Sequence, residues 1–239
     1  MLAIAGVKVD HIAKNYTVAG SRIEVFRDLN FELDANAITV IIGKSGCGKT
    51  TFLKIVSGME QADSGRIIMS ENEKIGMVFQ EPRLMPWLTC WQNISFGLNQ
   101  RTLDKRYIAE LIDKIGLTGF EKAYPNQLSG GMQQRTALAR ALAYNPSLIL
   151  MDEPFAALDF FTRGTMQQEL VSLQITNRKS IVFVTHSIDE ALLLGQKIVI
   201  LEDGLVKAEY DLSTFSYPRD ALSGPLIQIK RAILHIMED

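Results

Sequence analysis

The chain has 239 residues, with 25 lysines and arginines against 27 acidic residues, which gives a net charge of −2. This length favours a single domain, and the charge balance gives no general attraction to nucleic acid, so no nucleic-acid partner is expected. The two cysteines, Cys47 and Cys90, form no CxxC pair and indicate neither a disulfide framework nor a zinc site.

Apolar residues are spread along the chain in short runs. Residues 1–10 carry no basic stretch ahead of their apolar residues, so we expect no secretory leader there. No stretch reaches 18 apolar residues, so the chain is not expected to span a bilayer by itself.

The first third of the chain is predicted to form strands with one helix between them. Ile38–Ile42 is a short β-branched run ahead of Gly43, as in a buried strand, and a helix over 50–57 ends at Gly58. Further strands are predicted at 23–33, 66–69 and 75–79, with a turn at 63–65.

Helical patterns replace strand patterns over residues 81–147. Apolar residues at helical spacing predict helices at 91–98, 105–115 and 131–144. We therefore predict a helical sub-domain, 81–147, inserted into a single domain that spans 1–239.

Strands alternate with helices again after residue 147, which favours a mostly parallel sheet in an α/β fold. The expected strands are 148–151, 181–185 and 198–201, separated by helices at about 163–177 and 188–194. A hairpin turn is expected at 202–204, and residues 225–237 form an amphipathic helix.

A glycine-rich loop follows the strand at 38–42 and opens the next helix. Its residues fit G-x-x-x-x-G-K-[ST], and they are Gly43, Lys44, Ser45, Gly46, Cys47, Gly48, Lys49 and Thr50, with Thr51 next in the helix. Backbone N–H groups in such a loop point at one anion, and the helix dipole adds to them. We expect Lys49 to reach the β- and γ-phosphates of a nucleotide and Thr50 to bind Mg²⁺.

Two acids, Asp152 and Glu153, end the apolar strand at 148–151. Ligands bind beyond the carboxyl ends of parallel strands, so these acids are expected near the phosphate loop. Asp152 suits a metal ligand and Glu153 suits a base that polarises water. The alternative is a pair of acids that caps the segment beginning at Pro154.

A second helix start carries unusual glycines. Ser129 is a helix N-cap, and Gly130 and Gly131 follow it in the sequence LSGGMQQR. Glycines in a first turn cost helix propensity, up to about 1 kcal/mol each, so a plain cap would not favour them. We interpret this stretch as a second anion site, separate from the phosphate loop.

These three motifs, in this order, resemble the nucleotide-binding subunits of ABC transporters across essentially the whole chain. The resemblance implies a P-loop NTPase core of the ABC type, with a mixed, mostly parallel sheet, an antiparallel β sub-domain and an inserted helical sub-domain. It implies ATP and Mg²⁺ as cofactors and matches four further residues to family roles: Tyr16 for adenine, Gln80 for Mg²⁺, Asp159 for the dimer interface and His186 for the γ-phosphate. Taken singly, Tyr16 could be a core aromatic and His186 a structural histidine.

The family mechanism implies partners as well. Two copies clamp two ATP molecules head to tail, so that Ser129, Gly130 and Gly131 of one copy act on the nucleotide of the other. The resemblance assigns catalysis to Lys49, Gln80, Glu153 and His186. It assigns the binding of Mg²⁺ to Thr50, Gln80 and Asp152. The resemblance also implies integral membrane permease subunits, a solute-binding protein and a peripheral place on the cytoplasmic face of the inner membrane.

The blocks FQEPRLMPW and PFAALD resemble bacterial importers of the nitrate, sulfonate, taurine and pyrimidine-precursor type. The alternatives are the ATPase of an exporter or lipid transporter, a soluble ABC protein, and a cassette that binds ATP without hydrolysing it. An apolar cluster within 81–100 (Met85, Pro86, Trp87, Leu88 and Trp91) is expected either to dock the permease or to form core.

The chain departs from the family at a few positions. Ser187 stands where similar importers commonly have an acid, Cys90 replaces an aliphatic residue, and Phe160 and Phe161 stand where smaller or polar residues are usual. We further expect the helix N-terminus and Lys49 to lower the pKa of the Cys47 thiol and make it reactive. A cysteine packed against the sheet and unreactive is the alternative.

Overall fold

The fold is taken from a computed structural model, which describes residues 6–71 and 73–238. Part of the segment expected to lack a leader, residues 1–5, lies outside this range. Within the described residues, every helix is too short or too polar to cross a membrane.

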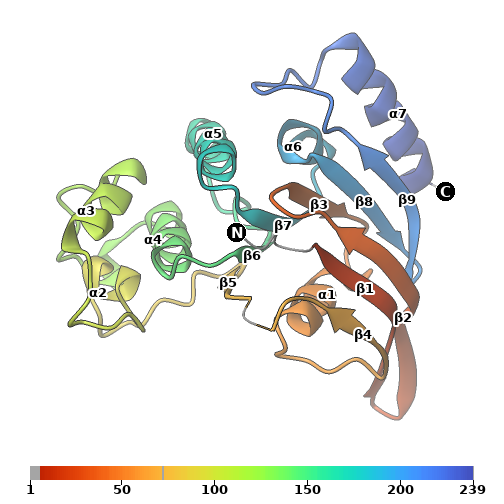
Figure 1. The fold of residues 1–239 in the computed structure, drawn as a ribbon, viewed down its shortest axis with the longest axis horizontal. Helices are drawn as coiled ribbons and strands as arrows, with labels where there is room; N and C mark the ends of the chain where they lie inside the picture. The colour runs from red at the N-terminus through yellow and green to blue at the C-terminus, as the bar shows by residue number, and fades with distance from the viewer. Residues whose placement is uncertain (1–5, 72, 239) are drawn as a thin grey trace.

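The central sheet has the strand order β5-β6-β7-β3-β8-β9 (Figure 1). The first five strands run parallel, and β9 pairs antiparallel with β8. This confirms the mixed, mostly parallel sheet. The bounds are β3 (Ile38–Ile42), β5 (Ile75–Val78), β6 (Leu148–Asp152), β7 (Ser180–Thr185), β8 (Lys197–Glu202) and β9 (Leu205–Asp211).

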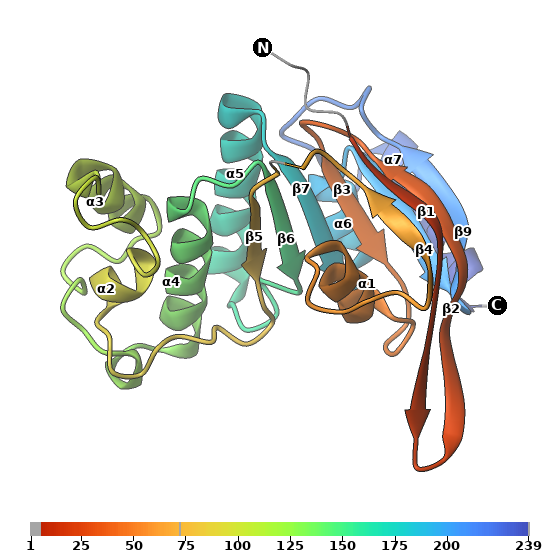
Figure 2. The same cartoon turned by 60° about the horizontal axis from the view of Figure 1, so that its bottom comes forward.

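A second, antiparallel sheet has the order β2-β1-β4, with β1 at Val7–Val18, β2 at Ser21–Leu33 and β4 at Ser64–Ile68. The β1–β2 hairpin extends beyond the rest of the fold (Figure 2). Strand β1 was not predicted. Its pairing with β2 shifts register between Val9 and Ile12, where His11 has a φ of 53°, so the strand lacks the regular alternation by which a sequence indicates one.

Two hydrophobic clusters lie on opposite faces of the central sheet. In β3, Val40 and Ile42 belong to the larger cluster, which also contains buried residues of 90–143. Ile41 belongs to the cluster shared with the antiparallel sheet. Phe52, in helix α1 (Lys49–Val56), packs in the second cluster, with its ring centroid 5.4 Å from that of Phe31. Both faces of the central strands are buried, which explains their continuous apolar runs.

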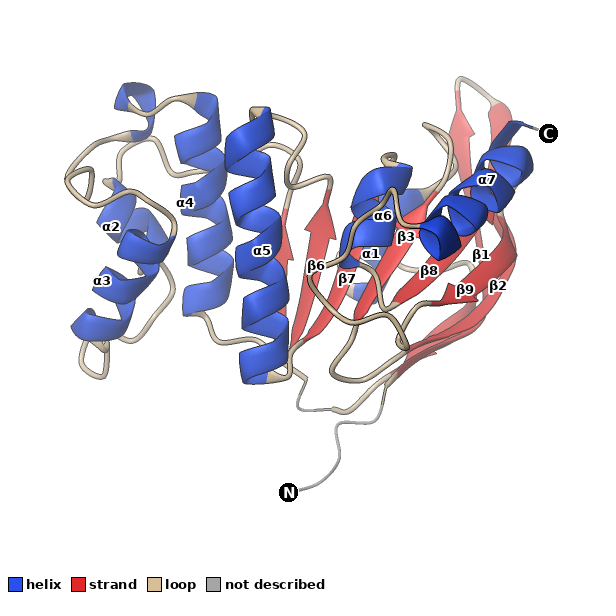
Figure 3. Cartoon of the chain, turned by 90° about the horizontal axis from the view of Figure 1, so that it is seen from above, coloured by secondary structure: helices blue, strands red, loops and turns tan. Residues whose placement is uncertain are grey.

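The helices gather at the two sides of the sheet (Figure 3). Beyond the β5 edge of the central sheet lie α2 (Cys90–Ile94), α3 (Lys105–Lys114) and α4 (Gly130–Ala143), with the short 3₁₀ helix Pro125–Gln127 (Figure 1). The others are α1 (Lys49–Val56), α5 (Phe160–Asn177), α6 (Ile188–Leu194) and α7 (Gly224–Glu238). The proposed boundary of a helical sub-domain at 81–147 stays a prediction.

One helix is shorter than the sequence pattern indicates. The helix expected over 91–98 ends at Ile94, because Ser95 closes it and Gly97 takes a φ of 81°. The side chain of Asn93 is buried, and its amide nitrogen donates to the carbonyl of Met85 at 3.1 Å, so it anchors the loop before the helix.

Candidate functional site

The phosphate-type loop connects β3 to α1, and its glycines are needed for two different reasons. Gly46 and Gly48 have φ values of 85° and 101°, in the left-handed region that favours glycine. At Gly48 a Cβ atom would also lie 2.6 Å from side-chain atoms of Val25 and Phe26. The loop therefore needs glycine at 48 on both conformational and steric grounds.

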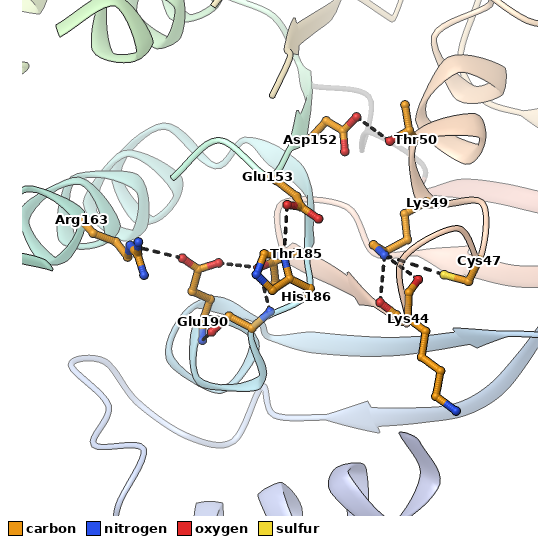
Figure 4. A network of polar contacts seen from close by, with 12 residues as sticks. Lys44, Cys47, Lys49, Thr50, Asp152, Glu153, Arg163, Thr185, His186 and Glu190 are labelled. Carbon is orange, nitrogen blue, oxygen red and sulfur yellow. Dashed lines mark hydrogen bonds and ion pairs between the residues drawn. The ribbon is translucent and has the colours of Figure 1, made fainter. Parts of the chain in front are cut away.

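Lys49 is buried at the centre of this loop. Its ammonium donates to the carbonyls of Gly43 at 2.8 Å and Lys44 at 3.0 Å (Figure 4). Lys44 points elsewhere and forms an ion pair with Glu202 at 2.9 Å. Of the two lysines in the loop, Lys49 is thus the one positioned to neutralise an anion bound inside it.

Thr50 and Asp152 join α1 to the end of β6. The Thr50 hydroxyl donates to Oδ2 of Asp152 at 2.7 Å. Burial raises the pKa of the Asp152 carboxyl, and this hydrogen bond opposes the shift. A hydroxyl and a carboxylate held together are hard oxygen ligands of the kind that Mg²⁺ prefers.

The adjacent acid, Glu153, turns away from Asp152. It has a φ of 42°, and its N–H donates to the carbonyl of Val184 on β7 at 3.0 Å. This turn directs the carboxylate to His186, whose Nδ1 lies 3.1 Å from Oε2 of Glu153. Two neighbouring acids therefore face two different partners, as Figure 4 shows.

A hydrogen-bonded network behind His186 was not predicted. Ser187 caps α6 by accepting from the N–H of Glu190 at 3.3 Å, and the Thr185 hydroxyl donates to the Glu190 carboxylate. Glu190 also lies 4.0 Å from Arg163 of α5. The spacing of Ser187 and Glu190 is that of a capping box, which was the signal available in the sequence.

An open cleft of about 530 Å³ brings most of the predicted residues together. It is bounded by the phosphate loop, the ends of β5 and β6, residue 186 and strands β1 and β2 of the antiparallel sheet. Val25 is the one lining residue that the sequence did not indicate. The lining residues are Tyr16, Val25, Ser45, Gly46, Gly48, Lys49, Thr50, Thr51, Gln80, Glu153 and His186.

The second glycine-bearing helix start lies outside that cleft. Ser129 caps α4, its hydroxyl accepting from the N–H of Met132 at 3.3 Å, and Gly130 beside it is exposed. A Cβ at Gly131 would lie 3.2 Å from Leu158, so this glycine allows close packing. Asp159 likewise lies outside the cleft and caps α5, accepting from the N–H groups of Phe161 and Thr162 at 3.1 and 3.0 Å.

Cys47 does not have the activated thiol that the sequence suggested. Burial raises the pKa of this thiol, and this outweighs the opposing effect of Lys49, whose Nζ lies 3.9 Å from the sulfur. The sulfur packs against the cluster shared with the antiparallel sheet. The predicted lowering of the Cys47 pKa is therefore wrong, because desolvation exceeds the attraction of the ammonium.

Comparison with known proteins adds an independent finding. Residues 26–156 match the sequence family described as ABC transporter. The chain is 40% identical to an uncharacterized ABC transporter ATP-binding protein of Methanocaldococcus jannaschii, over 98% of this chain and 91% of that protein. It is 38% identical to the aliphatic sulfonates import ATP-binding protein SsuB of Bacillus thuringiensis subsp. konkukian, over 97% of this chain and 96% of that protein.

Solved structures are similar as well. A dimeric ATP-binding cassette in a post-hydrolysis state, bound to ADP and phosphate, superposes with a TM-score of 0.79 at 33% identity, over 86% of this chain and 98% of that one. A dimeric bacterial ABC transporter cassette gives a TM-score of 0.78 at 32% identity, over the same shares.

The raised pKa of Cys47 predicts slow alkylation at neutral pH. Because the thiolate is the nucleophile, the rate of modification by N-ethylmaleimide should be below that of a free cysteine at pH 7 and should still rise beyond pH 9. Mass spectrometry of the peptide that contains Cys47 measures this rate, and the buried Cys90 serves as the internal comparison. A Cys47 rate at pH 7 equal to that of free cysteine would contradict the assignment.

Proposed function

Because the chain belongs to the ABC transporter family and is an ATPase, we propose that it powers the import of an aliphatic sulfonate or a similar small anion. The observation that carries the proposal of import is the similarity over nearly the whole chain to ATP-binding proteins of sulfonate importers, and the Glu153–His186 pair in the cleft supports ATP hydrolysis. These relatives favour import over the alternative of export.

We assign the cleft to ATP. The loop from Gly43 to Thr50, with Thr51, holds the phosphates through its backbone N–H groups and the ammonium of Lys49. Tyr16 lines the same cleft from β1 and offers an aromatic face to the adenine. In this arrangement the base and the phosphates are held by different sheets.

A magnesium ion fits the oxygen ligands of this site. Thr50 and the raised-pKa carboxylate of Asp152 already lie in contact, and Gln80 lines the cleft beside them. When bound, Mg²⁺ neutralises charge on the phosphates. Thr50, Gln80 and Asp152 are the residues that would hold it.

Catalysis requires a polarised water next to the γ-phosphate. Glu153 supplies a carboxylate that accepts a proton from this water, and its left-handed backbone conformation directs it into the cleft. His186 contacts that carboxylate and is 64% exposed at the side chain, so it can also reach a phosphate oxygen. Behind it, the Thr185–Glu190 contact fixes the start of α6.

Glu153→Gln should abolish turnover while leaving ATP binding intact. The amide keeps the shape but cannot accept the proton, so kcat should fall at least about hundredfold. In proteoliposomes with the cognate permease, ATP-driven uptake of an aliphatic sulfonate should stop together with ATP hydrolysis. Uptake or hydrolysis at the wild-type rate would show that another group is the base, and sulfonate efflux in place of uptake would contradict an importer.

Ser129, Gly130, Gly131 and Asp159 serve a partner copy in this proposal. None of them lines the cleft of its own chain, and Ser129 and Gly130, at the second glycine-bearing helix start, are exposed. The similar cassettes are dimers. A second copy would place this helix start against the γ-phosphate of the first, where its free N–H groups stabilise negative charge.

A mixed dimer tests this trans arrangement. Lys49→Ala damages the cleft of one protomer, and Ser129→Arg damages the helix start of the other, so both lesions fall on one composite site. The heterodimer, isolated by two affinity tags, should trap about one nucleotide per dimer, whereas each mutant homodimer should trap none. A heterodimer that traps none, with both protomers shown to be folded, would argue for cis sites.

We propose integral membrane permease subunits as the second partner, a solute-binding protein in the complete transporter, and a peripheral position at the cytoplasmic face of the inner membrane. Trp87, which follows Gln80 by a short loop, is 68% exposed. Trp91 instead packs against the larger core. The expected docking cluster is thereby reduced to its exposed members around Trp87.

Cysteines introduced at Pro86 and Trp87, the exposed members of the cluster, should cross-link to a cytoplasmic loop of the cognate permease. Their position next to Gln80 gives the physical reason, since a docked loop could then respond to the cleft. Leu222→Cys, at a side chain 73% exposed, is the matched control and should not cross-link. Absence of any cross-link from 81–100 in an intact complex would refute this docking surface.

A further inference from the structure

The two most exposed large apolar side chains recorded in the described chain are neighbours. Phe160 and Phe161, at the start of α5, are 81% and 83% exposed. Their rings contact each other edge to face, with centroids 5.6 Å apart. Scattered single apolar residues are ordinary on a surface, but an adjacent aromatic pair at this exposure indicates a contact with another molecule.

The backbone that carries the pair is held by hydrogen bonds on both sides. Asp159 accepts hydrogen bonds from the N–H of Phe161 and the N–H of Thr162, and these contacts lower the pKa of its carboxyl. Arg163 donates to the carbonyl of Leu158 at 3.0 Å, which fixes the loop from the other side. Because this backbone is already ordered, a partner that covers the pair has no loop to order on binding.

The position of the pair identifies the partner. The segment 154–161 starts beside Glu153 in the nucleotide cleft, and its Leu158 lies against Gly131 of the second glycine-bearing helix start. In a head-to-tail pair, the cleft of each protomer faces the glycine-bearing start of the other. The two-fold axis therefore passes between these two sites, and whatever lies between them meets its own copy.

We propose that Phe160 and Phe161 form a four-ring aromatic cluster with their copies at the two-fold axis, and that this cluster favours association of two chains before ATP binds. The proposal rests on the dimer put forward above and adds the residues that anchor it without nucleotide. Aromatic side chains at the centre of an interface are the usual carriers of binding energy. Neither ring lines the nucleotide cleft, so the proposed contact between the rings involves no atom of ATP.

Identical positions near a two-fold axis can be cross-linked to each other. In a Cys47→Ala/Cys90→Ala background that also carries Glu153→Gln, Phe161→Cys should form a disulfide-linked dimer under mild oxidation, with or without ATP. Leu222→Cys is the control, because an exposed residue away from the axis should give no linked dimer. Failure of Phe161→Cys to link while the ATP-bound dimer is present by sedimentation would overturn the proposal.

A second measurement does not depend on cross-linking. Phe160→Ser/Phe161→Ser should raise the nucleotide-free dimer Kd about 30-fold or more and leave ATP binding to the single chain unchanged. The matched variant Ile175→Ser/Leu222→Ser removes two exposed apolar side chains elsewhere and should leave this Kd unchanged. Equal Kd values for the two double variants would refute the anchor. Failure of the proposed function would appear instead in the Glu153→Gln parent, as loss of the ATP-dependent dimer.

Discussion

The parallel register of β3, β7 and β6 is the constraint on which the site depends. Ile42 at the end of β3 pairs with Thr185 of β7, and Val184 of β7 pairs with Asp152 at the end of β6. The loops that leave these three strands therefore begin at one edge of the sheet. The buried residues of β3 and β7 hold that register, because a slip would move them into the wrong hydrophobic cluster and separate the loops.

The same register explains what could be predicted from the sequence. Short apolar runs followed by glycine or acids indicate parallel strands with polar ends, so the phosphate loop, Asp152 and Glu153 were predictable. The predictions that failed depended on backbone conformations or on packing that the residue pattern does not contain. The shifts in β1 and the early end of α2 follow from backbone conformations at His11 and Gly97. Whether burial or Lys49 determines the Cys47 pKa depends on packing that no local pattern contains.

Several residues with a proposed function also have a structural role that is visible in one chain. Ser129 and Asp159 cap α4 and α5, and Gly131 makes room for Leu158. These roles complicate mutagenesis, because substitution at Asp159 would loosen α5 by about 1 kcal/mol of capping as well as alter any interface. A Cβ atom added at Gly130 would meet no neighbouring atom within 4 Å. A substitution at Gly130 would therefore test the proposed contact with a partner copy without disturbing the packing of its own chain.

Helix α4 links distant parts of the molecule. It begins at Ser129, and further along it the buried Gln134 donates to the carbonyl of Phe79, directly before Gln80. Arg140, near its other end, donates to the carbonyls of Pro82 and Arg83. The helix is thus hydrogen-bonded at two points to the segment that carries Gln80. Three hydrogen bonds therefore tie this one helix, which begins at the exposed Ser129, to the segment from Phe79 to Arg83, which lies a few residues before the exposed Trp87.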